Sequence, residues 1–355
     1  MNPIKSINYS VFFEDSSFSQ IKEFLNKNRF SKVFVLMDEN TRKFCAPILF
    51  KKVKILSTAP QIVLAPGERH KNLNSLQFIW KSLSDQSADR GSLLINLGGG
   101  MINDIGGFAA STYMRGISFI NIPTSLLAMA DASVGGKTGI DFLGYKNQIG
   151  IFCNPSAVFI QPHFLKTLTE REKKNGFAEI LKAALIADKK LWKEISTLAF
   201  SETNLKKWIY SSVTIKNNIV LSDFFEKLQR KKLNFGHTVG HALESVYLNK
   251  KVSLLHGEAI VIGMICESFI SHQMGLLSLK EKKEITDYLK QYVVIKKIPV
   301  TYYAQLMRFI IKDKKNTLGS IRMAIPKKIG NCMVDMEVTQ EQVLSSFDDF
   351  NRFVS

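Results

Sequence analysis

Short runs of aliphatic and β-branched residues, each ending in turn-forming or polar residues, constrain the fold of this chain more than any other feature. Five such runs occupy residues 32–40, 61–68, 92–100, 117–124 and 157–162, and they alternate with helical segments. This alternation is typical of a parallel sheet. The continuous apolar run SLLINL indicates a strand buried on both faces. We therefore expect an α/β domain that binds ligands at the carboxyl ends of its strands.

The second half of the chain shows helical periodicity. Apolar residues recur at helical spacing in residues 176–188, 205–228, 237–247 and 257–274. One β-like stretch, residues 319–338, interrupts this pattern and fits either a hairpin or an edge element. The sequence thus predicts a Rossmann-like parallel-sheet domain over residues 1–165 and a mainly α-helical domain over residues 166–355.

Composition narrows the class of protein but does not choose a partner. The formal charge is +17, from 48 Lys and Arg against 31 Asp and Glu, which suits nucleic acid, an anionic membrane surface or an anionic substrate. The lysines come in short groups, as on solvated helix faces, rather than in one Arg-rich stripe. No signal-peptide pattern and no apolar span of roughly 18 residues occurs, so we expect a cytoplasmic protein without a membrane partner. The four cysteines form no CxxC pair, which argues against a zinc ribbon or a redox motif.

Polar residues follow the first two predicted strands. Asp38 and Asn40 end the first run, while Glu68 and Lys71 follow the second. An acid at a strand end can hold the ribose hydroxyls of a dinucleotide. Asp and Asn at such positions are more often simple turn formers, so this signal is weak alone.

A glycine-rich segment, residues 98–111, follows the third strand with the sequence GGGMINDIGGFAAS. Consecutive glycines bring backbone amides close to a phosphate, and the helix start that follows favours anions. Asn103 stands where GxGxxG would have its third glycine, so the ordinary dinucleotide fingerprint does not apply. A plain strand-to-helix turn needs only one or two glycines, so five within ten residues, with Asp104 among them, favour a pyrophosphate site.

Residues 123–141 place Thr124 and Ser125 after another strand, then Asp131, then a turn at residues 135–138. The sequence GGKT at this turn resembles a P-loop only superficially, because the first glycine of GxxxxGK is missing. Nucleotide hydrolysis is therefore not predicted.

Carboxylate, lysine and histidine side chains cluster in the helical half. Glu179 and Lys182 share one helix face, either as an exposed ion pair or pointing together into a cleft. His237 and His241 follow at i,i+4 spacing, with His256 shortly after. Histidine and carboxylate together are ligands suited to Zn²⁺. Spacing alone would make both His237 and His241 ligands, although HExxH is absent.

These motifs form a long ordered set: GGGxxxD, PTSLLAxxDASVGGKTG, YKNxIGxF, TLxxREKxNGxAExxK, LNFGHTxGHALE and LHGEA, followed by DKK. Over about residues 30–320 the set resembles the 3-dehydroquinate synthase family of sugar phosphate cyclases. The resemblance implies a dehydroquinate synthase-like fold with an active site between its two domains. It also implies NAD and one Zn²⁺ or Co²⁺ per subunit as cofactors, and a homodimer.

The resemblance also implies residue roles. The metal ligands would be Glu179, His237 and His256, with His241 as a nearby acid/base group rather than a ligand. NAD contacts would come from Asp38, Asn40, Glu68, Lys71, Gly99, Gly100, Asp104, Thr124, Ser125, Lys137, Lys146, Phe164, Thr167, Leu168 and Glu172. Catalytic groups besides His241 would be Lys137, Asp131, Lys182, Arg230 and Asn234. Substrate contacts would be Asn147, Lys216 and a lysine of DKK, either Lys314 or Lys315.

The implied reaction converts 3-deoxy-D-arabino-heptulosonate 7-phosphate to 3-dehydroquinate and phosphate, a step of the shikimate pathway to aromatic amino acids. Transient oxidation by NAD⁺ would precede loss of phosphate, re-reduction and ring closure. Another sugar phosphate cyclase or a metal-dependent polyol dehydrogenase on the same scaffold is the first alternative. A basic nucleic-acid-binding protein is the second, but no nucleic-acid-binding motif supports it, and we expect a small anionic substrate as the partner.

Overall fold

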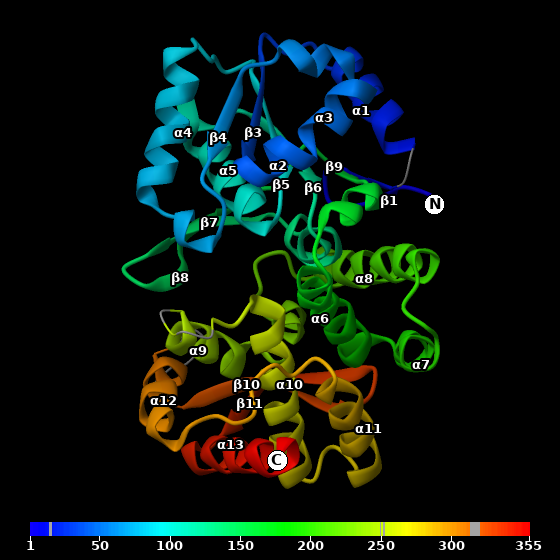
Figure 1. Ribbon diagram of the computed structural model, residues 1–355, viewed down its shortest axis with the longest axis vertical. Coiled ribbons are helices and arrows are strands. Elements are labelled where there is room, and N and C mark those ends of the chain that lie inside the picture. The colour runs from blue at the N-terminus through cyan, green and yellow to red at the C-terminus, as the bar shows by residue number, and fades with distance from the viewer. Residues whose placement is uncertain (14–15, 249, 251–252, 313–319) are drawn as a thin grey trace. The chain divides into compact units, whose positions relative to one another are not determined.

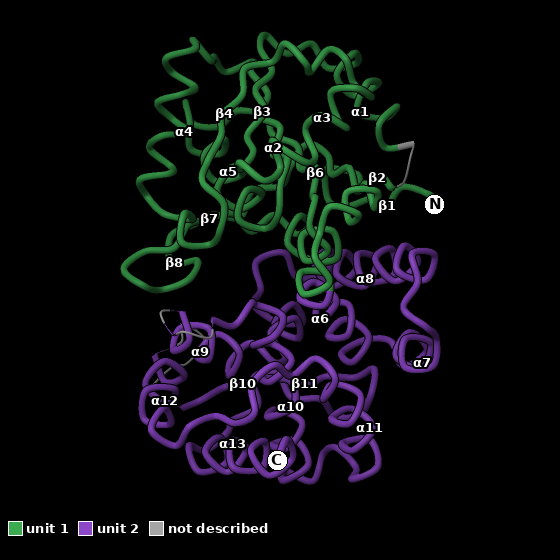
Figure 2. Tube along the Cα trace, viewed as in Figure 1, with its two compact units in different colours: residues 1–173 green, residues 174–355 purple. Residues whose placement is uncertain are grey.

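The structure, a computed structural model, describes residues 1–13, 16–248, 250, 253–312 and 320–355. It contains two compact units, residues 1–173 and 174–355 (Figure 2). The sequence placed the boundary between residues 165 and 166, within the segment that leads into helix α6. Among the described residues, no helix combines the length and the apolar character that crossing a bilayer requires.

Unit 1 is built on a parallel sheet (Figure 1). Its strand order is β1-β2-β9-β6-β5-β3-β4, and only the short β1 pairs antiparallel with its neighbour, β2. The strands are β1 (Ile4–Lys5), β2 (Ser10–Phe13), β3 (Val33–Asp38), β4 (Gln61–Leu64), β5 (Leu93–Gly98), β6 (Ser118–Pro123) and β9 (Ala157–Ile160). All residues of β5 are buried, as its continuous apolar sequence predicts.

The helices of unit 1 bury the sheet. They are α1 (Ser16–Lys27), α2 (Glu39–Phe44), α3 (Ala46–Lys52), α4 (Leu73–Asp85) and α5 (Gly100–Thr112). One core cluster joins Ile79 of α4 and Ile105 of α5 to Phe34, Leu94 and Phe119 of the sheet. The predicted α/β class of this half is therefore confirmed.

A hairpin of two further strands, β7 (Lys137–Phe142) and β8 (Tyr145–Phe152), extends from unit 1. The sequence analysis expected a turn over residues 135–138. Gly135 and Gly136 do form a turn with positive φ values of 101° and 69°, but Lys137 and Thr138 already belong to β7. The expected turn is thus only half correct, because Thr138 pairs across the hairpin with Ile151.

Unit 2 is mainly helical, as predicted. Its helices are α6 (Glu170–Ala187), which begins in the last residues of unit 1, α7 (Lys189–Thr197), α8 (Glu202–Ser222), α9 (His237–Tyr247), α10 (His256–Gln273), α11 (Leu279–Lys290), α12 (Tyr303–Ile311) and α13 (Gln340–Val354). The β-like stretch near the end is a hairpin of β10 (Ile321–Lys328) and β11 (Asn331–Val338). Fifteen of the eighteen residues of α10 are buried, so this helix forms the centre of the unit.

Candidate functional site

Three helices of unit 2 approach one another at glycines. A Cβ on Gly263 of α10 would overlap the carbonyl oxygen of Gly236 and lie 2.9 Å from the Gly240 amide nitrogen of α9. A Cβ on Gly257 of α10 would overlap the carbonyl oxygen of Asn175 in α6 and lie 2.7 Å from its carbonyl carbon. Because these glycines have no side chain, α10 packs directly on the backbones of α9 and α6. The close approach brings together the polar side chains at the ends of the three helices.

The start of α9 is held by a buried carboxylate from α10. Gly236 precedes the helix with a left-handed φ of 79° and has no side chain to cap it. Glu267, which is fully buried, accepts from the Gly236 amide at 2.5 Å and from the Val239 amide at 3.4 Å. An anion at a helix N-terminus is favourable, and this one fixes the position of His237, the first helical residue.

The side chains of Glu179, His237 and His256 converge in unit 2. Glu179 Oε1 lies 3.2 Å from His256 Nε2 and 3.6 Å from His237 Nε2, and one ligand atom of each residue lies within 4.8 Å of the others. The His237 Nδ1 lies 3.1 Å from the carbonyl oxygen of Phe235, which leaves Nε2 as the lone-pair nitrogen. Two imidazoles and one carboxylate aimed at one point match the three-ligand set of a catalytic zinc site. The donor set therefore fits a divalent metal.

His241 lies beside this group but outside it. Its ring centroid is 5.1 Å from that of His237 and 6.0 Å from that of His256. The structure groups His237 with residues from two other helices, not with its i,i+4 neighbour. The three residues that the resemblance implies as metal ligands thus lie together, while His241 belongs to a second group with Glu244 and His256.

Lys182 stands one turn after Glu179 on α6 and forms an ion pair with it. Both side chains are almost completely buried, at 2% and 1% exposure. Of the two interpretations of this pair, the exposed ion pair is therefore wrong. A buried cation beside the carboxylate offsets the cost of removing that charge from water.

Glu244 is a site residue that the sequence analysis missed. Its Oε2 lies 3.1 Å from His256 Nδ1, on the opposite side of the ring from Glu179. Burial lowers the pKa of His256, but the carboxylates of Glu244 and Glu179 outweigh burial and raise this pKa to about 9. Helical spacing could have identified Glu244 from the sequence, because it lies on the same face of α9 as His237 and His241.

The remaining predicted residues of unit 2 that the structure describes precede α9 in the sequence, and each is buried or hydrogen-bonded. Arg230 is 1% exposed, and its guanidinium donates to the Phe224 carbonyl at 2.6 Å. Asn234 donates to Glu226 Oε1 at 2.8 Å, and Lys216 is buried on α8. Lys314 and Lys315 lie outside the described residues.

In unit 1, three predicted NAD residues, Asp38, Gly99 and Gly100, lie where the sheet reverses its winding. The chain leaves β3 toward β4 on one side, and leaves β5 toward β6 on the other. Parallel sheets bind ligands at the carboxyl ends of the strands at such a point. Asp38 ends β3, and its carboxylate caps α2 by accepting from the Thr41 amide at 2.8 Å. Asn40 lies in the first turn of this helix. Asp38 thus has the local structural role expected of a turn former. This cap uses the carboxylate oxygen Oδ1, so Oδ2 can accept from another partner.

The glycine-rich segment forms the junction of β5 and α5. Gly99 precedes the helix and Gly100 begins it, so the first amides of α5 meet the carboxyl end of the sheet. The Thr124 amide, which follows β6, donates to the Gly98 carbonyl at 3.0 Å. A Cβ on Gly99 would lie 3.2 Å from Ser125 Oγ, which would narrow the junction. This is the geometry expected of a phosphate-binding turn.

Lys71, which is buried, contacts several predicted residues that are themselves partly or fully exposed. Its Nζ lies 2.6 Å from Asp104 Oδ2, 2.5 Å from Asn147 Oδ1 and 3.5 Å from Glu68 Oε1. Burial lowers the pKa of Lys71, but the carboxylates of Asp104 and Glu68 outweigh burial and keep this pKa above its usual value. The cluster joins three predicted NAD contacts with one predicted substrate contact, Asn147.

The other predicted residues of unit 1 lie on later elements of the chain. Asp131 lies in the π-type turn η4 (Ala128–Ala132), Lys137 begins β7, and Lys146 lies in β8. The short 3₁₀ segment η5 (Pro162–Thr167) and the residue after it carry Phe164, Thr167 and Leu168. Glu172 accepts from the Thr169 amide at 3.0 Å, in a capping box at the start of α6.

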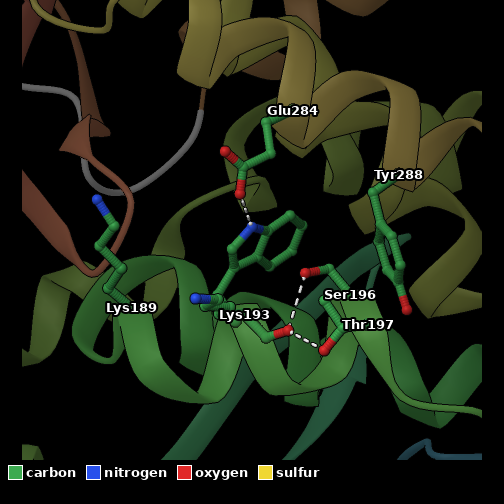
Figure 3. A pocket seen from close by; sticks show the side chains of 7 residues that line it. Lys189, Lys193, Ser196, Thr197, Glu284 and Tyr288 are labelled. Atoms are coloured by element: carbon green, nitrogen blue, oxygen red, sulfur yellow. Dashed lines mark hydrogen bonds between the residues drawn. The ribbon is translucent and has the colours of Figure 1, made fainter.

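A pocket of about 520 Å³ in unit 2 is lined by other residues (Figure 3). Glu284 accepts there from the indole nitrogen of Trp192 at 2.7 Å, and the hydroxyl of Tyr288 donates to the Ile195 carbonyl at 3.1 Å. Lys189 and Lys193 stand exposed at its rim. No residue predicted for the site lines this pocket, so it is separate from the histidine cluster.

Two adjacent segments of the sequence match one family. Residues 61–175 match 3-dehydroquinate synthase N-terminal, and residues 176–316 match 3-dehydroquinate synthase C-terminal. The chain is 39% identical to 3-dehydroquinate synthase from Parabacteroides distasonis over 333 residues, which are 93% of this chain and 94% of that one. The alternative of a nucleic-acid-binding protein receives no support from these matches.

Two solved structures share the fold. A 2-epi-5-epi-valiolone synthase from Streptomyces hygroscopicus, with NAD⁺ and Zn²⁺ bound, has a TM-score of 0.86 and 25% identity, over 99% of both chains. A 2-deoxy-scyllo-inosose synthase complexed with carbaglucose-6-phosphate, NAD⁺ and Co²⁺ has a TM-score of 0.85 and 22% identity, over 98% of this chain and 100% of that one. The predicted dehydroquinate synthase-like fold class is confirmed.

Proposed function

The chain belongs to the 3-dehydroquinate synthase family, and we propose that it is a phosphate-eliminating lyase that uses catalytic NAD and a divalent metal. Its substrate would be 3-deoxy-D-arabino-heptulosonate 7-phosphate, and its products 3-dehydroquinate and phosphate. The observation that carries this proposal is the convergence of Glu179, His237 and His256 within one helical unit. A family match alone would not show that the reacting groups are in place.

Glu179, His237 and His256 would hold the metal. When bound, a divalent metal supplies a Lewis acid that polarises a substrate hydroxyl and favours loss of its proton. Lys182 pairs with the buried carboxylate of Glu179, and a neighbouring cation favours the charged form that a metal ligand needs. Zinc is the metal we propose, since two imidazoles and a carboxylate suit it.

The NAD site would lie at the carboxyl ends of β3 and β5. NAD⁺, when bound there, supplies a hydride acceptor that returns the hydride within the same cycle. The amides at the start of α5 would bind the pyrophosphate, and Asp38 would accept from a ribose hydroxyl. The neighbour with a TM-score of 0.86 binds NAD⁺, which supports NAD as a cofactor of this chain.

The substrate carries a carboxylate and a phosphate, so its site needs cations. Lys182, Lys216 and Arg230 supply three, and each is at least nine-tenths buried. Charge-assisted hydrogen bonds formed away from water are strong enough to hold a doubly anionic substrate in one orientation. His241, adjacent to the ligand histidines, would move a proton to or from the substrate.

The same proposal includes the homodimer and the cytoplasmic location that the family resemblance implies. Neither is needed for the chemistry described above.

Turnover of two matched substrates tests the proposed function. Phosphate release should be rapid from 3-deoxy-D-arabino-heptulosonate 7-phosphate, and much slower from a heptulose 7-phosphate that lacks the carboxylate. The reason is that buried cations left without their anionic partner are costly. Equal turnover of both sugars would instead favour another sugar phosphate cyclase. Oxidation of a simple polyol without phosphate release would favour a dehydrogenase.

A further inference from the structure

Glu244 lies on α9 at helical spacing from His237 and His241, and its side chain is 5% exposed. Its Oε2 lies 3.1 Å from His256 Nδ1, while His256 Nε2 lies 3.2 Å from Glu179 Oε1. The imidazole of His256 is thus held between two carboxylates, one at each nitrogen. We propose that Glu244 is a positioning residue, which accepts the Nδ1 proton of His256 and so directs the Nε2 lone pair at the metal. The inference rests on the metal site proposed above.

The hydrogen-bonding capacity of the two groups supports this role. A neutral imidazole carries one N–H, and an ionised carboxylate can only accept. With its proton on Nδ1 and shared with Glu244, His256 presents a lone pair at Nε2, on the side of Glu179. A lone pair and a carboxylate oxygen 3.2 Å apart repel each other unless a proton or a metal ion lies between them. Glu244 therefore favours the tautomer in which a metal can take that place.

The two ligand histidines are held differently. His237 Nδ1 faces the neutral carbonyl of Phe235, also at 3.1 Å, whereas His256 Nδ1 faces a charged carboxylate. His256 is the first residue of α10. The positive end of the helix dipole lies there, and it disfavours positive charge on the imidazole and donation of its lone pair to a cation. Its side chain is also the more exposed of the two, at 24% against 12%. The carboxylate of Glu244 accepts a stronger hydrogen bond than the carbonyl of Phe235 does, and it raises the basicity of the imidazole more. His256 needs this increase more than His237 does.

Glu244 also belongs to a second group of potential ligands. Among the described residues, His241, Glu244 and His256 offer ligand atoms within 4.8 Å of one another. Filling both groups at once would require His256 to lose its Nδ1 proton and bridge two metals. One metal with a hydrogen-bonded Nδ1 needs no such change, so the geometry favours positioning over ligation.

The test compares zinc affinity in four forms of the full chain: wild type, Glu244→Ala, Glu244→Gln and Glu284→Gln. Glu284→Gln is the matched control, since this carboxylate of the same unit accepts from the Trp192 indole and contacts no histidine ligand. Each protein is stripped of metal and titrated with zinc against a chromophoric chelator. Glu244→Ala should bind zinc about 10 to 100-fold more weakly. Glu244→Gln should lose less, because its amide oxygen still accepts the Nδ1 proton, and Glu284→Gln should equal wild type.

A second readout separates positioning from general stability. Long-range ¹H–¹⁵N spectra of the zinc-loaded wild type should show His256 protonated at Nδ1, and Glu244→Ala should shift or broaden that signal. A purely structural role would lower the unfolding temperature but leave the tautomer and the zinc affinity unchanged. If Glu244→Ala fails to fold, the near-isosteric Glu244→Gln decides, because a neutral acceptor should still bind zinc more weakly than the carboxylate, and a zinc affinity equal to that of the wild type would overturn the proposal.

Three other outcomes are informative. Two zinc ions per wild-type chain, with one lost in Glu244→Ala, would show that Glu244 is a ligand and overturn its positioning role. Absence of zinc binding by the wild type would overturn the proposed metal site itself, and this inference with it. Normal zinc binding and phosphate release by both Glu244 variants would overturn this inference alone.

Discussion

Replacing Gly263 by alanine tests whether the contact between α9 and α10 positions the metal ligands. The new methyl group would overlap the carbonyl oxygen of Gly236 and lie 2.9 Å from the Gly240 amide nitrogen. Both atoms belong to backbone, so they cannot rotate away, and the two helices must separate. That separation would carry His237 on α9 away from His256 on α10.

The magnitude follows from two opposing effects. Overpacking a closed core costs about 1 to 3 kcal/mol, and a backbone obstacle places Gly263→Ala at the upper end. Alanine in a helix interior recovers about 1 kcal/mol relative to glycine. The net loss should be about 2 kcal/mol, which lowers the unfolding temperature by roughly 4 to 8 °C for a unit of this size.

Gly240→Ala provides a matched control on the facing helix. Its Cβ would lie 2.7 Å from Ile260 Cδ1, the end of a flexible side chain, and 3.2 Å from the nearest backbone oxygen. The smaller crowding should be offset by the gain in helix propensity, so the unfolding temperature should hardly change.

Thermal unfolding and zinc titration of both variants give the decisive comparison. Gly263→Ala should unfold earlier and bind zinc at least about tenfold more weakly, because metal sites tolerate only about 0.5 Å of ligand displacement. Gly240→Ala should behave like wild type in both assays. A Gly263→Ala protein with wild-type stability and zinc affinity would refute the argument that this contact sets the ligand geometry.

Further predictions concern single residues and the metal itself. Glu179→Ala and His256→Ala each remove one of three protein ligands, so zinc content and phosphate release should be lost together; retained stoichiometric zinc would contradict that role. His241→Ala should keep zinc while losing turnover, and loss of zinc would make His241 a ligand. Arg230→Ala should raise the KM for the heptulosonate phosphate with NAD affinity nearly unchanged, since an unpaired desolvated anion costs about 2 to 5 kcal/mol. Equal weakening of NAD binding would contradict the assignment of Arg230 to the substrate. Free zinc at 100 times its dissociation constant should stabilise the chain against unfolding by about 2.7 kcal/mol, and a chelator should abolish this gain.

The strands of unit 1 could be predicted because each is a short apolar run bounded by polar or turn-forming residues. The sequence of β5 shows this most clearly, since all its residues are buried. The β7–β8 hairpin was harder to predict. Its glycines, Gly139 and Gly150, pack against each other's backbones rather than forming turns, and composition alone does not distinguish these uses.

The metal site shows what sequence spacing cannot supply. Helical periodicity correctly places His237 and His241 on one face of α9, but their partners come from other helices. Whether Glu179 and His256 reach His237 depends on how closely α6, α9 and α10 approach. That distance is set by glycines whose role appears only when the helices are packed. Glu244 was missed for the same reason, because its hydrogen-bond partner lies on α10.

Phosphate release before and after metal removal tests the central claim most directly. The purified chain would be assayed with 3-deoxy-D-arabino-heptulosonate 7-phosphate and NAD⁺, then after chelation, and again after zinc is returned, with metal content measured at each stage. We predict phosphate release with one zinc per chain, its loss on chelation, and its recovery in proportion to the zinc restored. Undiminished phosphate release from a chain shown to hold no metal would contradict the proposal that Glu179, His237 and His256 form a metal site that the reaction requires.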